Sequence, residues 1–155
     1  MSVNRGKQFE DIVKSAFASV EDVSIDRLHD QTTGFAGSKN ICDFIVYKEP
    51  NEYYIECKSI HGNTFPFSNV TDRQWQGLLE KAQIKGVFAG VLCWWVDKDT
   101  TRFMQITELD ALKQDGHKSV RYDKNIGYLI KGKKKRIFFE YDMRDFLCHV
   151  QEDIL

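Results

Sequence analysis

Several features that would mark particular protein classes are scarce or absent in this 155-residue chain. No apolar run is long enough to span a membrane, and the residues from Met1 to Lys7 contain no apolar core of a secretory signal. The four cysteines form no CxxC or Cys/His metal pattern, so we expect free core thiols, three of them inside apolar runs. We therefore expect a soluble, intracellular protein that does not bind membranes.

Proline is also rare, with two residues in the chain, and no linker, internal repeat or low-complexity segment is present. Hydrophobic residues make up 42% of the sequence, which is enough for a globular core. We predict one domain over residues 1–155, with a core at about 4–96 and an extension at about 97–155. The Walker-type phosphate loop, the nucleophile elbow and the dinucleotide fingerprint are all missing, so we expect no nucleotide cofactor.

Charge is nearly balanced overall, with a formal net charge of −1, which argues against a uniformly basic nucleic-acid binder. The segment from Lys118 to Arg136 nevertheless holds eight basic residues and one acidic residue. This asymmetry can supply a local phosphate-binding surface, and we predict DNA contacts by Lys133, Lys134 and Lys135. The alternative is a solvated hairpin turn whose lysines keep a strand edge soluble.

Hydrophobic periodicity gives the order of the elements. One apolar stripe predicts a first helix, through Phe9, Ile12, Val13, Ala16, Phe17 and Val20. Strands follow at 23–28, 42–46 and 54–58, then a helix from Thr71 to Gly86 with a capping box, and a strand at 87–96. This αβββαβ order predicts an α/β or α+β fold with a mixed central sheet. For the extension we predict a strand at 101–106, helices at 108–114 and 143–150, and a hairpin of 128–130 with 136–139.

The hairpin over residues 42–58 carries the clearest chemistry. Side chains alternate along a strand, so Glu56 and Lys58 share one face, and Asp43 lies near the start of the first strand. Two clustered carboxylates resist joint ionisation, whereas Mg²⁺, which takes oxygen ligands, would favour both ionised forms. Lys58 could then hold an attacking water or offset phosphate charge. The alternative is a half-exposed hairpin that carries ordinary surface charges.

Two neighbouring segments supply further candidates. On the first helix, Glu10 lies at the border of the apolar stripe while Asp11 lies on the solvent face, so Glu10 is the acid that could reach the site. The polar loop over residues 30–40 leads directly into Asp43, and we predict that its Lys39 contacts DNA. Glu10 could equally be a simple helix-flank glutamate, and the loop could be only a long connection.

The pattern of Asp43, Glu56 and Lys58 resembles the PD-(D/E)xK nuclease motif. Residues 4–10, Asn-Arg-Gly-Lys-Gln-Phe-Glu, are similar to the Asn-Arg-Gly-x-x-(Phe/Leu)-Glu opening of RecU-type Holliday junction resolvases. Residues 64–69, Thr-Phe-Pro-Phe-Ser-Asn, with Gln74 after them, resemble the Ser-Phe-Pro-x-x-Asn…Gln segment of that family. Over residues 4 to 96 the chain therefore resembles a compact, phage-type relative of these resolvases.

This resemblance implies a restriction-endonuclease-like core and Mg²⁺-dependent hydrolysis of DNA, with Mn²⁺ able to substitute. It implies a homodimer that makes paired nicks in branched DNA in the cytoplasm of a bacterial or phage-infected bacterial cell. The implied site comprises Glu10, Asp43 and Glu56 as metal carboxylates, Lys58 as the catalytic lysine, Gln74 as a site residue, and Arg5 and Lys7 at DNA phosphates. The helix-capping pattern explains Gln74 equally well.

One departure from the family bears on the substrate. RecU-type proteins carry a protruding stalk between the first strands, and the corresponding segment here, residues 31–40, is short. A nuclease acting on flaps, mismatches or nicked duplex therefore stays open as an alternative. A non-catalytic DNA-binding module with structural carboxylates is the competitor from a different class. It would bind DNA in a salt-sensitive way without metal-dependent cleavage.

Overall fold

The computed structural model describes residues 4–29, 40–135 and 139–149. A six-stranded sheet lies at its centre, in the order β1-β2-β3-β5-β6-β8. These strands are β1 (Ser24–Arg27), β2 (Phe44–Lys48), β3 (Asn51–Ile60), β5 (Val87–Trp95), β6 (Thr100–Gln105) and β8 (Tyr128–Leu129). β3 and β5 run parallel, and the other neighbouring strands run antiparallel. The predicted α+β class with a mixed central sheet is confirmed.

The remaining elements surround this sheet. The helices are α1 (Arg5–Ala18), α2 (Asp72–Ala82), α3 (Ile106–Gln114) and α4 (Met143–His149). Two small antiparallel sheets pair β4 (Thr64–Pro66) with β7 (Ser119–Arg121), and β9 (Gly132–Lys134) with β10 (Phe139–Tyr141). The order α1-β1-β2-β3-α2-β5 agrees with the predicted αβββαβ core, with β4 and a short 3-10 helix (Phe67–Asn69) inserted before α2.

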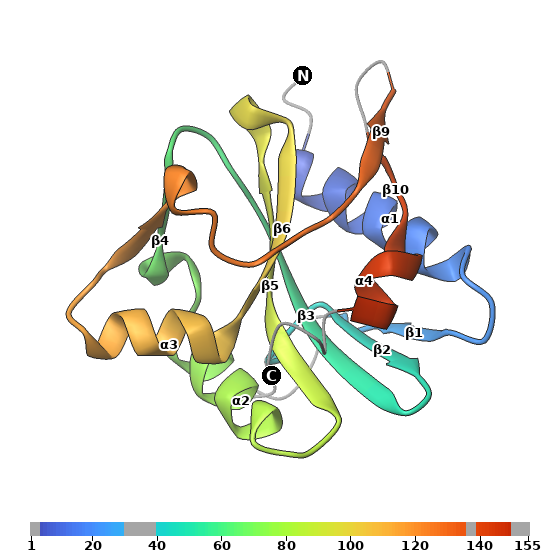
Figure 1. The fold of residues 1–155 in the computed structure, drawn as a ribbon, viewed down its shortest axis with the longest axis horizontal. Coiled ribbons are helices and arrows are strands. Elements are labelled where there is room, and N and C mark those ends of the chain that lie inside the picture. The colour runs from blue at the N-terminus through green and yellow to red at the C-terminus, as the bar shows by residue number, and fades with distance from the viewer. Residues whose placement is uncertain (1–3, 30–39, 136–138, 150–155) are drawn as a thin grey trace.

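Helices cover both faces of the sheet: α1 and α4 lie on one side, and α2 and α3 lie on the other (Figure 1). Phe9, Val13 and Phe17 of α1 belong to one buried cluster, because they recur at helical spacing. Trp75 and Leu78 of α2 belong to the second cluster. The sheet separates the two clusters, and side chains of β5 alternate between them.

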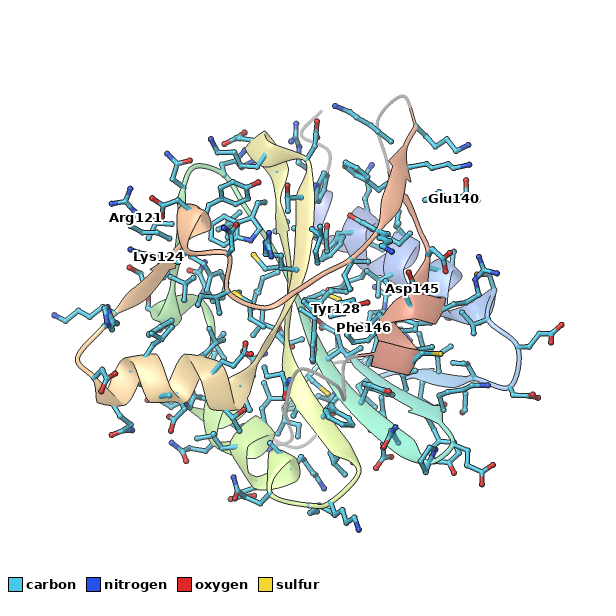
Figure 2. All side chains as sticks on the ribbon, viewed as in Figure 1. Arg121, Lys124, Tyr128, Glu140, Asp145 and Phe146 are labelled. Atoms are coloured by element: carbon cyan, nitrogen blue, oxygen red, sulfur yellow. The ribbon has the colours of Figure 1, made fainter. Side chains whose placement is uncertain are left out.

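The C-terminal helix completes the first of these clusters. The ring of Phe146 lies 5.0 Å from that of Phe103, 5.5 Å from Tyr53, 5.9 Å from Tyr128 and 6.1 Å from Phe17, measured between centroids. Figure 2 shows Phe146 on α4 with Tyr128 beside it. Residues of the predicted extension therefore pack directly against α1 and β3 of the predicted core.

The predicted hairpin of residues 128–130 with 136–139 is wrong in its described part, since Phe139 pairs with Lys134; residues 136–138 lie outside the described residues. Tyr128 and Leu129 instead pair with β6 at the edge of the central sheet, and Ile130 is buried. The hairpin that does form joins β9 to β10, so Lys133 and Lys134 lie within a strand. Burial of Tyr128 and Ile130 in or against the main core explains why this segment pairs with β6. The pairing of β4 with β7 was not predicted.

Three cysteines are buried, namely Cys42, Cys57 and Cys93, and all four are free thiols. Cys148 on α4 is exposed, so the expectation of a core position is wrong for this residue. The preceding residue, Leu147, is buried. Neighbouring residues of a helix face different directions, so Cys148 points to solvent while Leu147 points into the core. In the described part of the chain, each helix lacks the combination of length and apolar character that crossing a membrane requires.

Candidate active site

Asp43 lies where three strands meet. It directly precedes β2, whose register with β3 pairs Phe44 with Ile55. The amide of Asp43 donates to the carbonyl of Ile55 at 3.0 Å, and its carbonyl accepts from the amide of Leu28 at 2.7 Å. The backbone at Asp43 is therefore held from both sides, by the end of β1 and by β3.

The two carboxylates of the hairpin are brought to the same place. Asp43 Oδ2 accepts a hydrogen bond from the backbone amide of Cys57 at 2.8 Å. Glu56 is 4% exposed, and its Oε1 lies 3.1 Å from the Nζ of Lys58. Glu56 Oε2 is buried and has no hydrogen-bond partner in the structure of the described residues. A buried carboxylate oxygen without a partner is costly, so this atom is where a ligand would be stabilised.

Burial is the largest cause that raises the pKa of both acids. The pKa of Glu56 rises to about 7, with the charge of Asp43 as the next cause, against the lowering effects of Lys58 and Gln74. The pKa of Asp43 rises to about 6; the Cys57 hydrogen bond lowers it, and the charge of Glu10 raises it. Both carboxyls therefore resist losing their protons together, and a cation between them would remove that resistance.

Glu10 reaches the site from α1 and is held there by an arginine of β1. Arg27 Nη2 lies 2.5 Å from Glu10 Oε2, and Arg27 Nη1 lies 2.8 Å from Asp11 Oδ1. The Arg27 side chain is largely buried, and its guanidinium lies 5.9 Å from the centroid of the Phe44 ring. Sequence reasoning missed Arg27, because the strand pattern at 23–28 gives no signal that its last residue faces a helix.

These side chains line one pocket of about 310 Å³. Its lining consists of Glu10, Arg27, Leu28, His29, Asn40, Cys42, Asp43, Glu56, Lys58 and Gln74. The structure thus brings together the residues that the sequence predicts as catalytic, from α1, β3, α2 and the segment before β2. Gln74 also completes the predicted capping box, in which its Oε1 accepts from the amide of Thr71 at 3.1 Å. Gln74 therefore both caps the helix and lines the pocket, and its part in catalysis stays a prediction.

The donor set fits a hard divalent cation. Among the described residues, no group of three His, Cys, Asp or Glu side chains is arranged to hold a metal ion. Mg²⁺, however, usually keeps several waters and is bound by one or two carboxylates together with substrate phosphate. Asp43 and Glu56 supply two such carboxylates, and the orphaned Glu56 Oε2 is an oxygen that such a cation would satisfy. Glu10 is paired with Arg27 rather than joined to these two.

The residues predicted to bind DNA fall in three places. Arg5 and Lys7 are exposed in the first turn of α1, where the side chain of Asn4 caps the amide of Lys7. Lys39 lies outside the described residues. Lys133 and Lys134 lie on β9, with Lys135 directly after it, away from the lining of the pocket that holds Asp43.

Neighbouring carboxylates neutralise much of the lysine-rich segment. Lys134 Nζ lies 2.6 Å from Asp99, and Lys135 Nζ lies 3.3 Å from Glu140. Lys133 is in none of the ion pairs found between described residues. In Figure 2, Arg121 and Lys124 lie on the opposite side of the molecule from Glu140. Glu140 of β10 is the neighbour of Lys133 in the strand register of β9 and β10, so Lys133 lies on that second side. The basic run of the sequence is therefore divided between two regions of the surface.

Comparison with solved structures finds similarity to Hjc of Archaeoglobus fulgidus, a Holliday junction resolvase from an archaeal hyperthermophile. The two share 16% sequence identity with a TM-score of 0.46, over 68% of this chain and 78% of Hjc. No protein-family profile matches the chain, and no curated protein sequence matches it.

Proposed function

We propose that this protein is a divalent-metal-dependent DNA endonuclease of the PD-(D/E)xK type that cleaves four-way junctions. The observation that carries the proposal is the buried carboxylate of Glu56, which lines the same pocket as Asp43 and Lys58 and has one oxygen without a partner among the described residues. A structural salt bridge would satisfy both partners. Here Lys58 contacts one oxygen of Glu56, and the other oxygen has no hydrogen-bond partner in the part of the chain that the structure describes.

Each residue has a distinct part in this chemistry. Asp43 and Glu56 would hold the cation, which when bound supplies a water of lowered pKa and compensates charge on the phosphate. Lys58 would hold the attacking water or stabilise the developing charge of the transition state, since its Nζ lies beside the Glu56 carboxylate. Glu10, fixed by Arg27, would take an outer position in the pocket. Gln74, which lines the same pocket and lowers the pKa of Glu56, would orient that carboxylate.

The finer assignment rests on the sequence motifs. We assign the chain to the RecU-type resolvases as a compact, phage-type relative, with Mg²⁺ as the metal and Mn²⁺ as a substitute. A homodimer would present two such pockets to strands of opposite polarity and so make paired nicks. This assignment places the protein, as one nuclease domain, in the cytoplasm of a bacterial or phage-infected cell. Arg5 and Lys7, exposed in the first turn of α1, would approach DNA phosphates.

A nuclease for flaps, mismatches or nicked duplex is the second candidate. Two observations favour it: the segment at residues 31–40 is short for a stalk, and lysines of the basic segment are paired with carboxylates. Both features reduce the surface with which a protein could hold several duplex arms at once. The chemistry in the pocket would be the same for either substrate.

The deciding experiment compares cleavage of a labelled four-way junction with cleavage of a matched linear duplex, in Mg²⁺ or EDTA. The variants are wild type, Asp43→Asn, and Asp26→Asn as a control for charge loss at an exposed position of β1. Symmetric junction nicking that requires both Mg²⁺ and Asp43 supports a resolvase. Metal-dependent cutting of both substrates favours the second candidate. Well-folded wild type that binds DNA without cutting it would refute a nuclease.

A further inference from the structure

Helix α2 meets the candidate active site at Gln74 and packs against the segment that leads into the site at Gly77, about one turn further along. Gln74 lines the pocket, and Gly77 follows at i+3, so both lie on the same face of the helix. Glycine is a poor helix former, and Gly77 stands in the middle of an 11-residue helix. Its position therefore requires a reason other than helix stability.

The reason is a close approach by Ile41. A methyl group built on Gly77 would lie 2.4 Å from Ile41 Cγ2 and 2.9 Å from Ile41 Cβ. Rotation about χ1 could move Cγ2, but Cβ is bonded directly to the backbone and cannot be rotated away. Any side chain at position 77 would therefore displace the main chain at Ile41.

That main chain leads directly into the site. Cys42 comes next, with 2% exposure and a place in the pocket lining, and Asp43 follows it. On its other side Asp43 is held by Leu28, Ile55 and Cys57 through hydrogen bonds. A displacement of the main chain at Ile41, two residues before Asp43, would therefore strain the hydrogen bonds that orient the Asp43 carboxylate.

We propose that Gly77 is a positioning residue, which seats Ile41 against α2 and thereby sets where the Asp43 carboxylate stands relative to Glu56. Gln74 lines the same pocket as Glu56 from this helix face, so α2 would fix the separation of both carboxylates. This inference rests on the proposed metal-dependent function for its effect on catalysis. The packing of Gly77 on Ile41 does not depend on that function.

The test is a double-mutant cycle with Gly77→Ala, Ile41→Gly and the two combined, with Gln76→Ala as the control for a change at an exposed position of α2. Mn²⁺ affinity is measured by electron paramagnetic resonance, and folding by circular dichroism. The amide resonance of Cys57, the donor to Asp43, reports the carboxylate position without any metal. Gly77→Ala is expected to weaken Mn²⁺ binding about tenfold or more and to shift the Cys57 amide.

Rescue separates positioning from general damage. Removing the Ile41 side chain together with its Cβ leaves room for a methyl group at position 77, so the combined variant is expected to regain the affinity of Ile41→Gly. The same comparison applies if Gly77→Ala alone fails to fold. Wild-type affinity and an unshifted Cys57 amide in Gly77→Ala, or a combined variant without rescue, would overturn the inference. If wild type binds no Mn²⁺, the proposed function fails, and the Cys57 amide alone decides the inference.

Discussion

The backbone amide of Cys57 donates a 2.8 Å hydrogen bond to Asp43 Oδ2, across the two strands that carry the candidate metal carboxylates. The strand that supplies Glu56 therefore also orients Asp43. This hydrogen bond holds one oxygen of Asp43 against the sheet, while Glu56, which lines the same pocket, has one oxygen without a partner among the described residues. Predictions about metal binding and about stability both follow from this arrangement.

The metal-free protein is expected to lose stability as the pH rises from about 4.5 to about 7. The folded-state pKa of Glu56, about 7, lies above its usual value of 4.5, so the native state binds more protons than the unfolded state in this window. The stabilisation is thus complete at the acid end and lost towards pH 7, on the order of 3 kcal/mol for Glu56. Urea unfolding in EDTA across this range measures the loss. Glu56→Gln, which cannot ionise, should show a flatter profile; an equally steep one would contradict the assignment.

Divalent metal is expected to reverse this loss. Mg²⁺ or Mn²⁺ should raise the unfolding midpoint, because a ligand of the native state stabilises it by mass action. The rise should be larger at about pH 8 than at about pH 5, since protons compete for carboxylates of raised pKa. Differential scanning fluorimetry with and without metal measures it. Asp43→Asn should abolish the rise and Asp26→Asn should keep it.

Replacing Arg27 with glutamine is expected to reduce cleavage while leaving the fold intact. The change removes the cation that holds Glu10 and Asp11, so Glu10 loses its fixed place in the pocket. Asp11→Asn is the matched control, because it removes the outer, more exposed partner and leaves the Glu10 contact. We expect a drop of about tenfold or more in cleavage rate for Arg27→Gln and little change for Asp11→Asn. Equal rates in both variants would show that Arg27 does not support the site.

The lysine tract is expected to contribute to DNA binding unequally. Lys133→Ala should reduce the slope of log affinity against log salt by about one, as one phosphate contact is lost. Lys134→Ala should change the slope less, because its Nζ is already held by Asp99 at 2.6 Å. Fluorescence anisotropy over a salt series measures both. Unchanged binding in both variants would favour the alternative, in which the lysines keep a strand edge soluble.

Much of the site could be predicted because its signals are local. The alternation of charged and apolar residues on either side of Glu56, and the capping box that includes Gln74, lie within short stretches of sequence. The apolar stripe of α1 likewise distinguished Glu10 from Asp11, whose side chains are 26% and 57% exposed. Periodicity therefore sufficed to place these side chains on the correct faces.

The rest depends on contacts between residues far apart in the chain. Arg27 and Glu10 are 17 positions apart in the sequence, and Gly77 and Ile41 are separated by a hairpin and part of a helix. Hydrophobic periodicity shows which face of an element is buried, but it does not predict which distant residue that face will contact. β4 and β7 are three-residue strands whose pairing joins Phe65 to Val120, and such short runs carry little pattern of their own. The lysines of β9 have low strand propensity, so the sequence favoured a turn there.

Because Arg27 donates hydrogen bonds to both Glu10 and Asp11, it restricts the rotation of α1 about its own axis. Consecutive helical residues project about 100° apart, so one guanidinium bonded to both allows the helix a single orientation about its axis. Glu10 then lines the pocket with Asp43, and Asp11 lines a separate hollow beside β10. Inserting one residue between Asp11 and Val13 would turn Glu10 by about 100° relative to the buried residues Val13 and Phe17, and so carry its carboxylate away from the pocket.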